Sequence, residues 1–310
     1  MAQAIKQADI QPTRSSRFKL TNSRREALVA FGFLLPNFLA FLIFTLGPAL
    51  FSFVMGFTNW SGLSVGRWVG IENYLRLLQD PVFIKSLRNT LIYTLEFTPL
   101  CIIFSFGLAL LFNRKLWGTP VFRLLCFLPI VTDFISIAFV WSWIYHFRFG
   151  IINYFLKQLG LPAQAWLGDA KWALFALVVM SVWRWMGYYA VIILAGLQEI
   201  PREINEAATI DGANRQQVFT KITLPLLSST LFFVLIIAIT SSLSVFEQMY
   251  IMTKGGPQDS TISISMFLYQ QGFQLFRQGY ASAIAWVLFF LTFLVTALNW
   301  SVRKRWVYEG

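Results

Sequence analysis

The sequence contains few charged residues and almost none of the residues that build metal or disulfide sites. Of its 310 residues only 13% are charged, with two cysteines and one histidine. Cys101 and Cys126 both lie inside apolar segments, where a free cysteine usually behaves as a small hydrophobic residue. His146 has no cysteine cluster beside it. We therefore expect no structural disulfide, no zinc site and no di-metal site.

Three further absences narrow the function. The chain has no Gly-x-x-x-x-Gly-Lys-[Ser/Thr] sequence, so we expect it to bind no ATP itself. Its net charge of +11 comes from Lys and Arg that flank apolar segments, not from a compact basic domain, which argues against nucleic-acid binding. Paired carboxylates or histidines, which acid–base catalysis in a membrane enzyme would need, are also missing.

The sequence is instead rich in long apolar segments. It is 57% hydrophobic, and a helix needs about 20 apolar residues to cross a ~30 Å hydrocarbon core. Prolines 99, 129 and 225 lie inside predicted spans, where a proline can kink a helix rather than end it. We predict an all-α polytopic membrane domain over residues 29–302, between polar tails 1–28 and 303–310, with six spans: 29–56, 89–113, 120–145, 171–195, 223–250 and 279–302.

The distribution of basic residues predicts the orientation in the membrane. Lys and Arg are more frequent in the two tails, in residues 114–123 and in residues 196–222 than in the intervening loops. Positive residues favour the cytoplasmic side. Both termini and the segment 196–225 are therefore predicted to be cytoplasmic, in a bacterial plasma (inner) membrane.

The polar segment 196–225 has the pattern of a helix, a turn and a second helix. Apolar residues recur at helical spacing after Pro201, which suits a first turn, and Gly212 sits where that helix should end. A second short helix follows, before Leu224-Pro225 is expected to turn the chain into the fifth span. Such a loop either packs on its own membrane domain or presents a rigid face to a partner.

The spacing within this segment resembles the EAA loop of permease subunits of bacterial binding-protein-dependent ABC importers. The family pattern is Glu-Ala-Ala, three residues, Gly, nine residues, then Ile-x-Leu-Pro, and the chain fills every slot with Glu206, Ala207, Ala208, Gly212, Ile222, Leu224 and Pro225. The resemblance implies the type I importer permease fold and a coupling helix that docks in a groove of a cytoplasmic ATPase. By the same resemblance Glu206 would make the charged contact, Ala207 and Ala208 would permit close approach, and Gly212, after Asp211, would set the angle between the helices.

Looser motifs resemble the carbohydrate-uptake branch, of the maltose and glycerol-phosphate first-permease type. They include Leu197-Gln198-Glu199-Ile200-Pro201 and Met252-Thr253-Lys254-Gly255-Gly256-Pro257, although relatives usually have a small residue at Lys254. This branch implies a second, non-identical permease, two copies of an ABC ATPase that hold ATP and Mg, and a periplasmic or lipid-anchored solute-binding protein. The chain itself would bind no cofactor and would not be an enzyme. An ion-coupled secondary transporter is the alternative, but such proteins often have inverted repeats, and the sequence shows no repeat.

Ionisable residues inside the apolar segments are candidates for the substrate pathway, because charges in a bilayer usually face a cavity or a partner. Arg184 is expected either to donate to substrate or to form an interhelical ion pair with Glu247 or Asp133. Glu96 and Asp133 could lie near span ends or bond between helices. Sugar recognition combines polar groups with flat rings, which adds these residues to the candidate pathway: Trp183, Tyr188, Tyr189, Glu247, Gln248 and Tyr250.

Overall fold

The computed structural model describes residues 19–62, 66–114, 117–305 and 307. Within these ranges the chain is helical, as the sequence predicts, and no strand forms beyond a single bridge between Thr58 and Trp68. Two compact units are present, residues 1–54 and 55–310.

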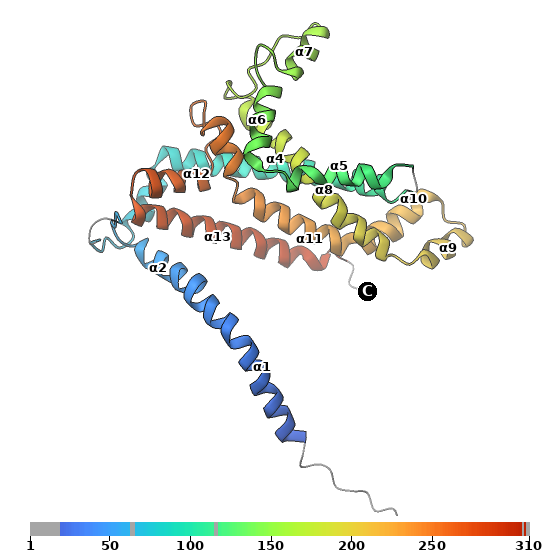
Figure 1. The fold of residues 1–310 in the computed structure, drawn as a ribbon, viewed down its shortest axis with the longest axis horizontal. Coiled ribbons are helices and arrows are strands. Elements are labelled where there is room, and N and C mark those ends of the chain that lie inside the picture. Colours follow the sequence, from blue (N-terminus) through green and yellow to red (C-terminus); the bar gives the residue numbers. More distant parts are fainter. Residues whose placement is uncertain (1–18, 63–65, 115–116, 306, 308–310) are drawn as a thin grey trace, which may run out of the picture. The chain divides into compact units, whose positions relative to one another are not determined.

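The elements follow one another along the chain, with the longest connections between α2 and α3 and between α7 and α8 (Figure 1). The α-helices, with π-helical or 3₁₀ turns marked η, are α1 (Lys19–Phe41), η1 (Leu42–Leu46), α2 (Gly47–Met55), α3 (Glu72–Gln79), α4 (Pro81–Phe112), α5 (Thr119–Val131), α6 (Phe134–Ile144), α7 (Ile151–Gln158), α8 (Ala173–Glu199), α9 (Arg202–Ile210), α10 (Arg215–Val218), η2 (Phe219–Thr223), α11 (Leu224–Leu243), η3 (Met249–Thr253), α12 (Ile264–Tyr269), η4 (Gln270–Gln274), α13 (Gln278–Val302) and η5 (Arg303–Arg305).

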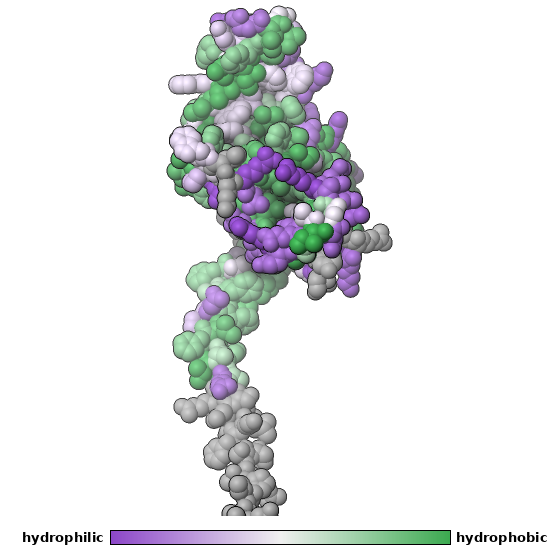
Figure 2. Space-filling model, turned by 90° about the vertical axis from the view of Figure 1, so that its right-hand side faces the viewer, coloured by the Kyte–Doolittle hydropathy of each residue, from purple (hydrophilic) through white to green (hydrophobic). Residues whose placement is uncertain are grey.

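The first unit is one apolar helix. α1, η1 and α2 run on from one another, and Val29–Met55 is long and apolar enough to span a membrane. Large apolar side chains along it are exposed in the single chain, among them Phe33 (82%) and Phe44 (78%), and this surface is largely hydrophobic (Figure 2). The span agrees with the predicted 29–56, although the helix already begins at Lys19, inside the predicted tail 1–28. Residues 1–18 of that tail lie outside the described residues.

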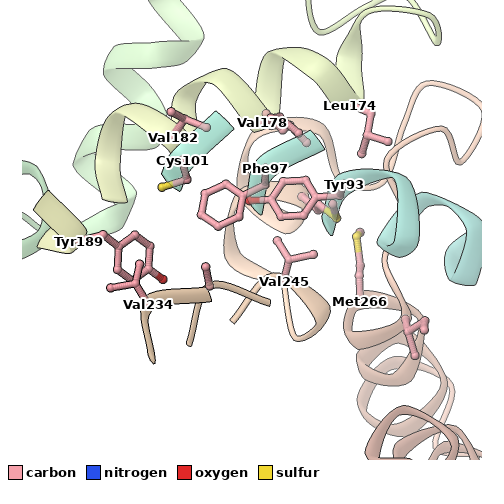
Figure 3. Packing of buried hydrophobic residues seen from close by; sticks show 14 of the residues in the cluster. Tyr93, Phe97, Cys101, Leu174, Val178, Val182, Tyr189, Val234, Val245 and Met266 are labelled. Carbon is pink, nitrogen blue, oxygen red and sulfur yellow. The ribbon is translucent and has the colours of Figure 1, made fainter. Parts of the chain in front are cut away.

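The second unit is built on four long helices. α4 packs along α8, and α11 packs on both and on α13 (Figure 1). Buried side chains of α4, α8 and α11 form the centre of the core, where Phe97 and Cys101 face Val178 and Val182 (Figure 3). Most of the outer side chains of these helices are apolar, as a lipid environment allows.

Four of the predicted spans correspond to continuous helical segments in this unit, with corrected boundaries. The second predicted span starts at Pro81, not at 89, because Asp80 caps the helix by accepting from the backbone N–H groups of Val82 (2.9 Å) and Phe83 (3.2 Å). The fourth runs over Ala173–Glu199 and the sixth over Gln278–Val302. The fifth covers Arg215–Leu243, so it begins before the predicted 223 and ends before 250.

The third predicted span, over 120–145, is present as two helices with a sharp bend between them. α5 and α6 together have the length and apolarity of a span, but they meet at 103°. Thr132 has extended backbone angles, and Asp133 starts the new helix by accepting from the backbone N–H of Ser136 at 3.1 Å. A side-chain cap of this kind stabilises a helix start, so the chain changes direction here. Asp133 is therefore a cap residue and not a buried partner for Arg184.

Candidate functional site

Two polar regions interrupt the apolar unit 55–310. The first is the α9–α10 corner, defined here as residues 200–223, which connects α8 to α11. It lies at the opposite end of the helical layer from α12 (Figure 1). Of the predicted coupling loop 196–225, the first four residues belong to α8 and the last two to α11.

The corner begins where α8 ends. Ile200 and Pro201 are extended, with ψ of 117° and 136°, and α9 starts at Arg202. Glu203 lies in the first turn of α9, where a negative charge interacts favourably with the helix dipole. The chain thus leaves the core and immediately forms a new helix.

Gly212 ends α9, as the sequence predicts. The N–H of Ala213 donates to the carbonyl of Ala208 at 2.9 Å, and that of Gly212 to Thr209 at 3.1 Å, which together make a Schellman motif. Gly212 has φ of +85°, and a Cβ built on it would meet no atom within 4 Å. Backbone conformation and not lack of space therefore requires glycine at this position.

The second arm of the corner has a capping box at its start. The N–H of Gln217 donates to Asn214 Oδ1 at 2.9 Å, and the N–H of Asn214 donates to Gln217 Oε1 at 2.8 Å. From Arg215 the helix continues through η2 into α11. The expected turn at Leu224-Pro225 is therefore wrong, because Pro225 occupies the first turn of α11, where the π-helical turn before it already lacks regular α-helical bonding.

Most of the α9–α10 corner is exposed, and only its last residues, before α11, pack against the helical layer. Glu206, Ala207 and Asp211 are exposed, Ala208 is half-buried, and Ile210 is 85% exposed. Hydrophilic residues gather on the face that carries α9 and α10 (Figure 2). At the base Phe219 contacts Phe106 of α4, with ring centroids 6.0 Å apart, and Ile222 and Pro225 are half-buried. Leu224, the remaining motif residue, is 37% exposed beside them.

The second polar region is a cavity of about 310 Å³ in the helical layer. It lies where α11 stops and residues 244–246 leave the helix before η3. Aromatic rings, three serines and one ion pair share its wall, which consists of Tyr93, Phe97, Arg184, Trp185, Ser241, Ser242, Ser244, Val245, Phe246, Glu247 and Gln248.

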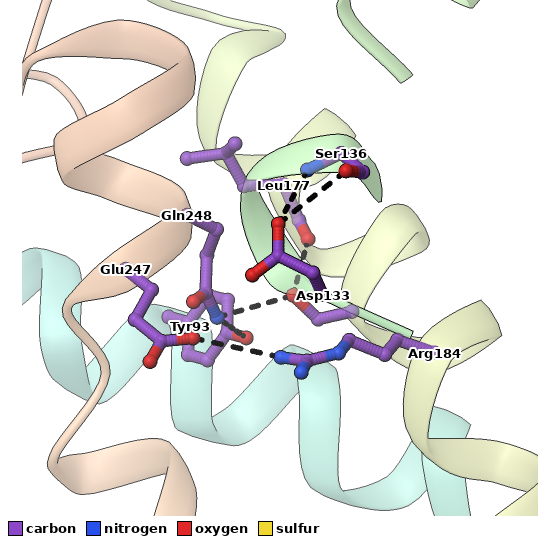
Figure 4. A network of polar contacts seen from close by, with 8 residues as sticks. Tyr93, Asp133, Ser136, Leu177, Arg184, Glu247 and Gln248 are labelled. Atoms are coloured by element: carbon purple, nitrogen blue, oxygen red, sulfur yellow. Dashed lines mark hydrogen bonds and ion pairs between the residues drawn. The ribbon is translucent and has the colours of Figure 1, made fainter. Parts of the chain in front are cut away.

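An ion pair crosses the cavity wall (Figure 4). Arg184 Nη1 lies 3.6 Å from Glu247 Oε2, and the two side chains are 14% and 59% exposed. The guanidinium also lies over the ring of Phe134, 4.7 Å from its centroid. Arg184 Nε is buried without a hydrogen-bond partner. The interhelical pair left open by the sequence therefore forms with Glu247, and one donor of Arg184 remains unused.

Gln248 connects three helices beside this pair. Its amide donates to the hydroxyl of Tyr93 on α4 at 2.8 Å and to Ser181 Oγ on α8 at 3.2 Å. Ser181 in turn donates to the carbonyl of Leu177 at 2.7 Å. Tyr93 stacks on Phe97 with centroids 5.6 Å apart. The amide thus holds the non-helical segment 244–246 against α4 and α8.

The structure brings only some of the predicted pathway residues together. Arg184, Glu247 and Gln248 line the cavity, but Trp183, Tyr188, Tyr189 and Tyr250 do not. Successive residues of a helix point about 100° apart, so Trp183 and Tyr188 face α6 and α5 instead, where they contact Trp141 (5.5 Å) and Phe127 (6.4 Å). Tyr189 and Tyr250 stack on two rings that line the cavity, those of Trp185 (5.7 Å) and Phe246 (5.2 Å).

Most residues in the wall of the cavity beside Arg184 were not predicted from the sequence. Tyr93 and Phe97 lie on α4, far along the chain from Arg184, and no local pattern marks them. Ser241, Ser242 and Ser244 carry a signal that could have been used, a cluster of small polar residues at the end of an apolar segment. Among the described residues no group of three His, Cys, Asp or Glu side chains could hold a metal ion.

Comparisons with known proteins agree with this architecture. Residues 101–307 match the family described as binding-protein-dependent transport system inner membrane component. The chain is 35% identical to the probable ABC transporter permease protein YesP of Bacillus subtilis, over 94% of this chain and 95% of that protein. It is 33% identical to the trehalose/maltose transport system permease protein MalF of Thermococcus litoralis, over 90% and 95% of the two proteins.

The fold is also similar to that of a solved transporter subunit. A chain in the crystal structure of a bacterial alginate ABC transporter, in complex with an alginate pentasaccharide-bound periplasmic protein, superposes with a TM-score of 0.80. The two chains are 22% identical in sequence. The superposed region covers 94% of the present chain and 99% of the transporter chain. With its apolar helices and these relatives, the chain is a multi-pass membrane protein that belongs to the binding-protein-dependent transport system inner membrane component family, the permeases of ABC transporters.

Proposed function

We propose that this chain forms half of the translocation pathway of an ATP-driven importer for a carbohydrate. The α9–α10 corner couples it to a separate cytoplasmic ATPase. A second, non-identical permease completes the pathway, two ATPase copies hold ATP and Mg, and a solute-binding protein delivers the substrate from outside. Both termini lie in the cytoplasm, and the chain holds no cofactor.

The observation that carries this proposal is the construction of the α9–α10 corner. The corner is rigid, because the Schellman motif at Gly212 and the capping box at Asn214 fix both arms by local hydrogen bonds. It nevertheless leaves Ile210 85% exposed and Glu206 in solvent. A rigid helical corner that exposes an apolar side chain, Ile210, near an acidic one, Glu206, is suited to bind in a groove of a partner protein.

The residues that line the cavity beside Arg184 suit a substrate with many hydroxyl groups. Three serines and the Tyr93–Gln248 pair provide donors and acceptors, and Phe97, Trp185 and Phe246 provide flat rings on which sugar faces stack. Arg184 and Glu247 compensate each other's charge, which favours a neutral sugar. The trehalose/maltose name of one relative is in line with this choice.

An acidic solute, such as an acidic sugar or glycerol phosphate, is the second candidate. It is favoured by the unpartnered, buried Nε of Arg184, which could donate to an anionic group. A solved bacterial ABC transporter of similar fold is described as involved in the import of the acidic polysaccharide alginate. Competition between neutral and acidic sugars for stimulation of ATP hydrolysis distinguishes the two candidates.

Purification from a mild detergent, after co-expression with the neighbouring genes, tests the function. We expect a second permease and an ATPase to co-purify, and a loaded solute-binding protein to stimulate ATP hydrolysis in the reconstituted complex. A chain that purifies alone and moves solute along an ion gradient in liposomes would contradict the proposal.

A further inference from the structure

A second, larger cavity lies at the base of the α9–α10 corner. Its volume is about 450 Å³, and it shares no residue with the cavity beside Arg184. Four segments meet around it: the end of α4, the start of α5, the end of α8 and the start of α9. The wall consists of Phe112, Asn113, Arg114, Thr119, Pro120, Arg123, Leu197, Gln198, Ile200, Arg202 and Asn205.

The described wall of this cavity is strongly positive. Arg114, Arg123 and Arg202 line it, and none of its described lining residues is acidic. No ion pair is formed by any of the three arginines within the described part of the chain. Arg123 donates one guanidinium N–H to the carbonyl of Phe112, while its Nε is buried without a partner. Three cations that share one cavity without a counter-charge favour an anionic occupant.

One helix start adds to this potential. α9 begins at Arg202, in the wall, and no side chain caps its first turn. The first backbone N–H groups of a helix have no partner within the helix and attract anions, phosphate above all. Asn205 Oδ1 is a buried acceptor without a donor, so the occupant should also carry a hydroxyl group.

The surroundings indicate a lipid as the source of such a group. Beyond the cavity α5 exposes Val121 (59%), Phe122 (62%) and Leu124 (63%), and Trp117 before it is fully exposed. Tryptophan is enriched at the membrane–water interface, and apolar side chains on α5 can cover acyl chains. Basic pockets between helices at the cytoplasmic surface are the usual sites for anionic lipid headgroups.

We propose that this cavity binds the headgroup of an anionic phospholipid with free hydroxyls, namely phosphatidylglycerol, from the inner leaflet. The phosphate contacts Arg123 and Arg202, and a glycerol hydroxyl donates to Asn205. The lipid thereby connects α5 to the start of α9. The inner-leaflet location rests on the orientation given under the proposed function.

Native mass spectrometry of the purified complex tests this proposal, with lipid supplied as mixed phosphatidylglycerol and phosphatidylethanolamine. We expect the wild-type chain to retain phosphatidylglycerol selectively. Arg123→Gln and Arg202→Gln should each weaken retention about fivefold, because one basic side chain near an anionic lipid contributes a factor of that size. Arg148→Gln, which removes an exposed arginine outside both the cavity and the α9–α10 corner, should leave retention unchanged and serves as the control.

The lipid site would be overturned by equal retention in all four proteins, by equal retention of both lipids, or by displacement of phosphatidylglycerol by inorganic phosphate alone, which would indicate a free-anion site. Loss of the lipid when the ATPase is added back would also overturn it and would assign the arginines to the ATPase contact. The same spectra report the bound ATPase, so its absence while phosphatidylglycerol remains would count against the proposed function and not against this site.

Discussion

The α9–α10 corner and the cavity beside Arg184 are both polar, but different kinds of contact hold them together. Hydrogen bonds in the corner join residues at most five positions apart, such as Ala213 to Ala208 and Gln217 to Asn214. The bonds of Gln248 instead reach Tyr93 and Ser181, more than sixty residues away in sequence. The corner is therefore a local structure, whereas the cavity exists only after α4, α8 and α11 have packed.

This difference predicts which property is lost first when each region is mutated. A substitution in the corner should change the presented surface and leave the helical layer intact, so that partner binding is lost first. A substitution in the cavity should change substrate passage, and at Gln248 also stability, while the corner continues to bind its partner. Four variants test this separation, from the largest expected effect to the smallest.

Gly212→Val should have the largest effect. A β-branched residue at φ of +85° costs about 1–2 kcal/mol, and the strain falls on the angle between the two arms. We expect at least a roughly tenfold loss of co-purifying ATPase, with normal amounts of the chain in the membrane. Gly160→Val is the matched control, because Gly160 has φ of +72° and equally open surroundings but lies outside the corner. Normal ATPase binding by Gly212→Val would contradict the assignment of the corner.

Arg184→Ala should rank second. It removes the partner of Glu247 and a donor of the cavity, so we expect roughly tenfold slower uptake with the complex still assembled. Because Glu247 is 59% exposed, solvent screens the pair and its contribution to stability is small. Arg148→Ala, which removes an exposed arginine outside the cavity, is the control. Loss of assembly in Arg184→Ala would reassign the ion pair to a purely structural role.

Gln248→Leu should have an intermediate effect, mainly on stability. It leaves Tyr93 and Ser181 without their donor, which costs about 1–3 kcal/mol. We expect a lower melting temperature of the complex, and a several-fold reduction in uptake with normal ATPase binding. Adding Tyr93→Phe should recover part of the stability, because it removes one of the unpaired groups. A double variant less stable than both single variants would argue against this hydrogen bond.

Gln217→Ala should have the smallest effect. It breaks one half of the capping box, which is worth about 0.5–1 kcal/mol at a solvent-exposed helix start. We expect ATPase binding to fall less than in Gly212→Val and uptake to stay near the wild-type rate. Asn214→Ala removes the other half of the box and should behave in the same way. A loss as large as that of Gly212→Val would show that α10 and not the Gly212 cap sets the corner.

The sequence predicts the local parts of this molecule better than the packed parts. Gly212 and the presence of a second short helix follow from residues within one or two turns, and apolar length predicts five spans and the bent pair α5 and α6. The bend at Thr132–Asp133 was not predicted, because apolar residues continue on both sides of the break. Only the helix cap at Asp133 marks the start of a new helix. Leu224-Pro225 suggested a turn, but a proline in a first helical turn needs no N–H partner, so the helix continued.

The wall of the cavity could not be predicted for a different reason. Arg184, Glu247 and Gln248 stood out because polar residues are rare within apolar segments. Tyr93 and Phe97 look like ordinary residues of an apolar helix, and their role depends on how α4 lies along α8. Gly187 permits the neighbouring approach of α5, because a Cβ there would overlap the carbonyl oxygen of Cys126. Such contacts are set by the packing of distant segments, and a single sequence does not encode them in any local pattern.

The most direct test measures ATPase co-purification and substrate uptake side by side for Gly212→Val and Arg184→Ala. We expect Gly212→Val to lose both, whereas Arg184→Ala loses uptake and keeps its ATPase. Normal ATPase binding by Gly212→Val, or loss of the ATPase from Arg184→Ala, would contradict the separation of a coupling corner from a substrate cavity.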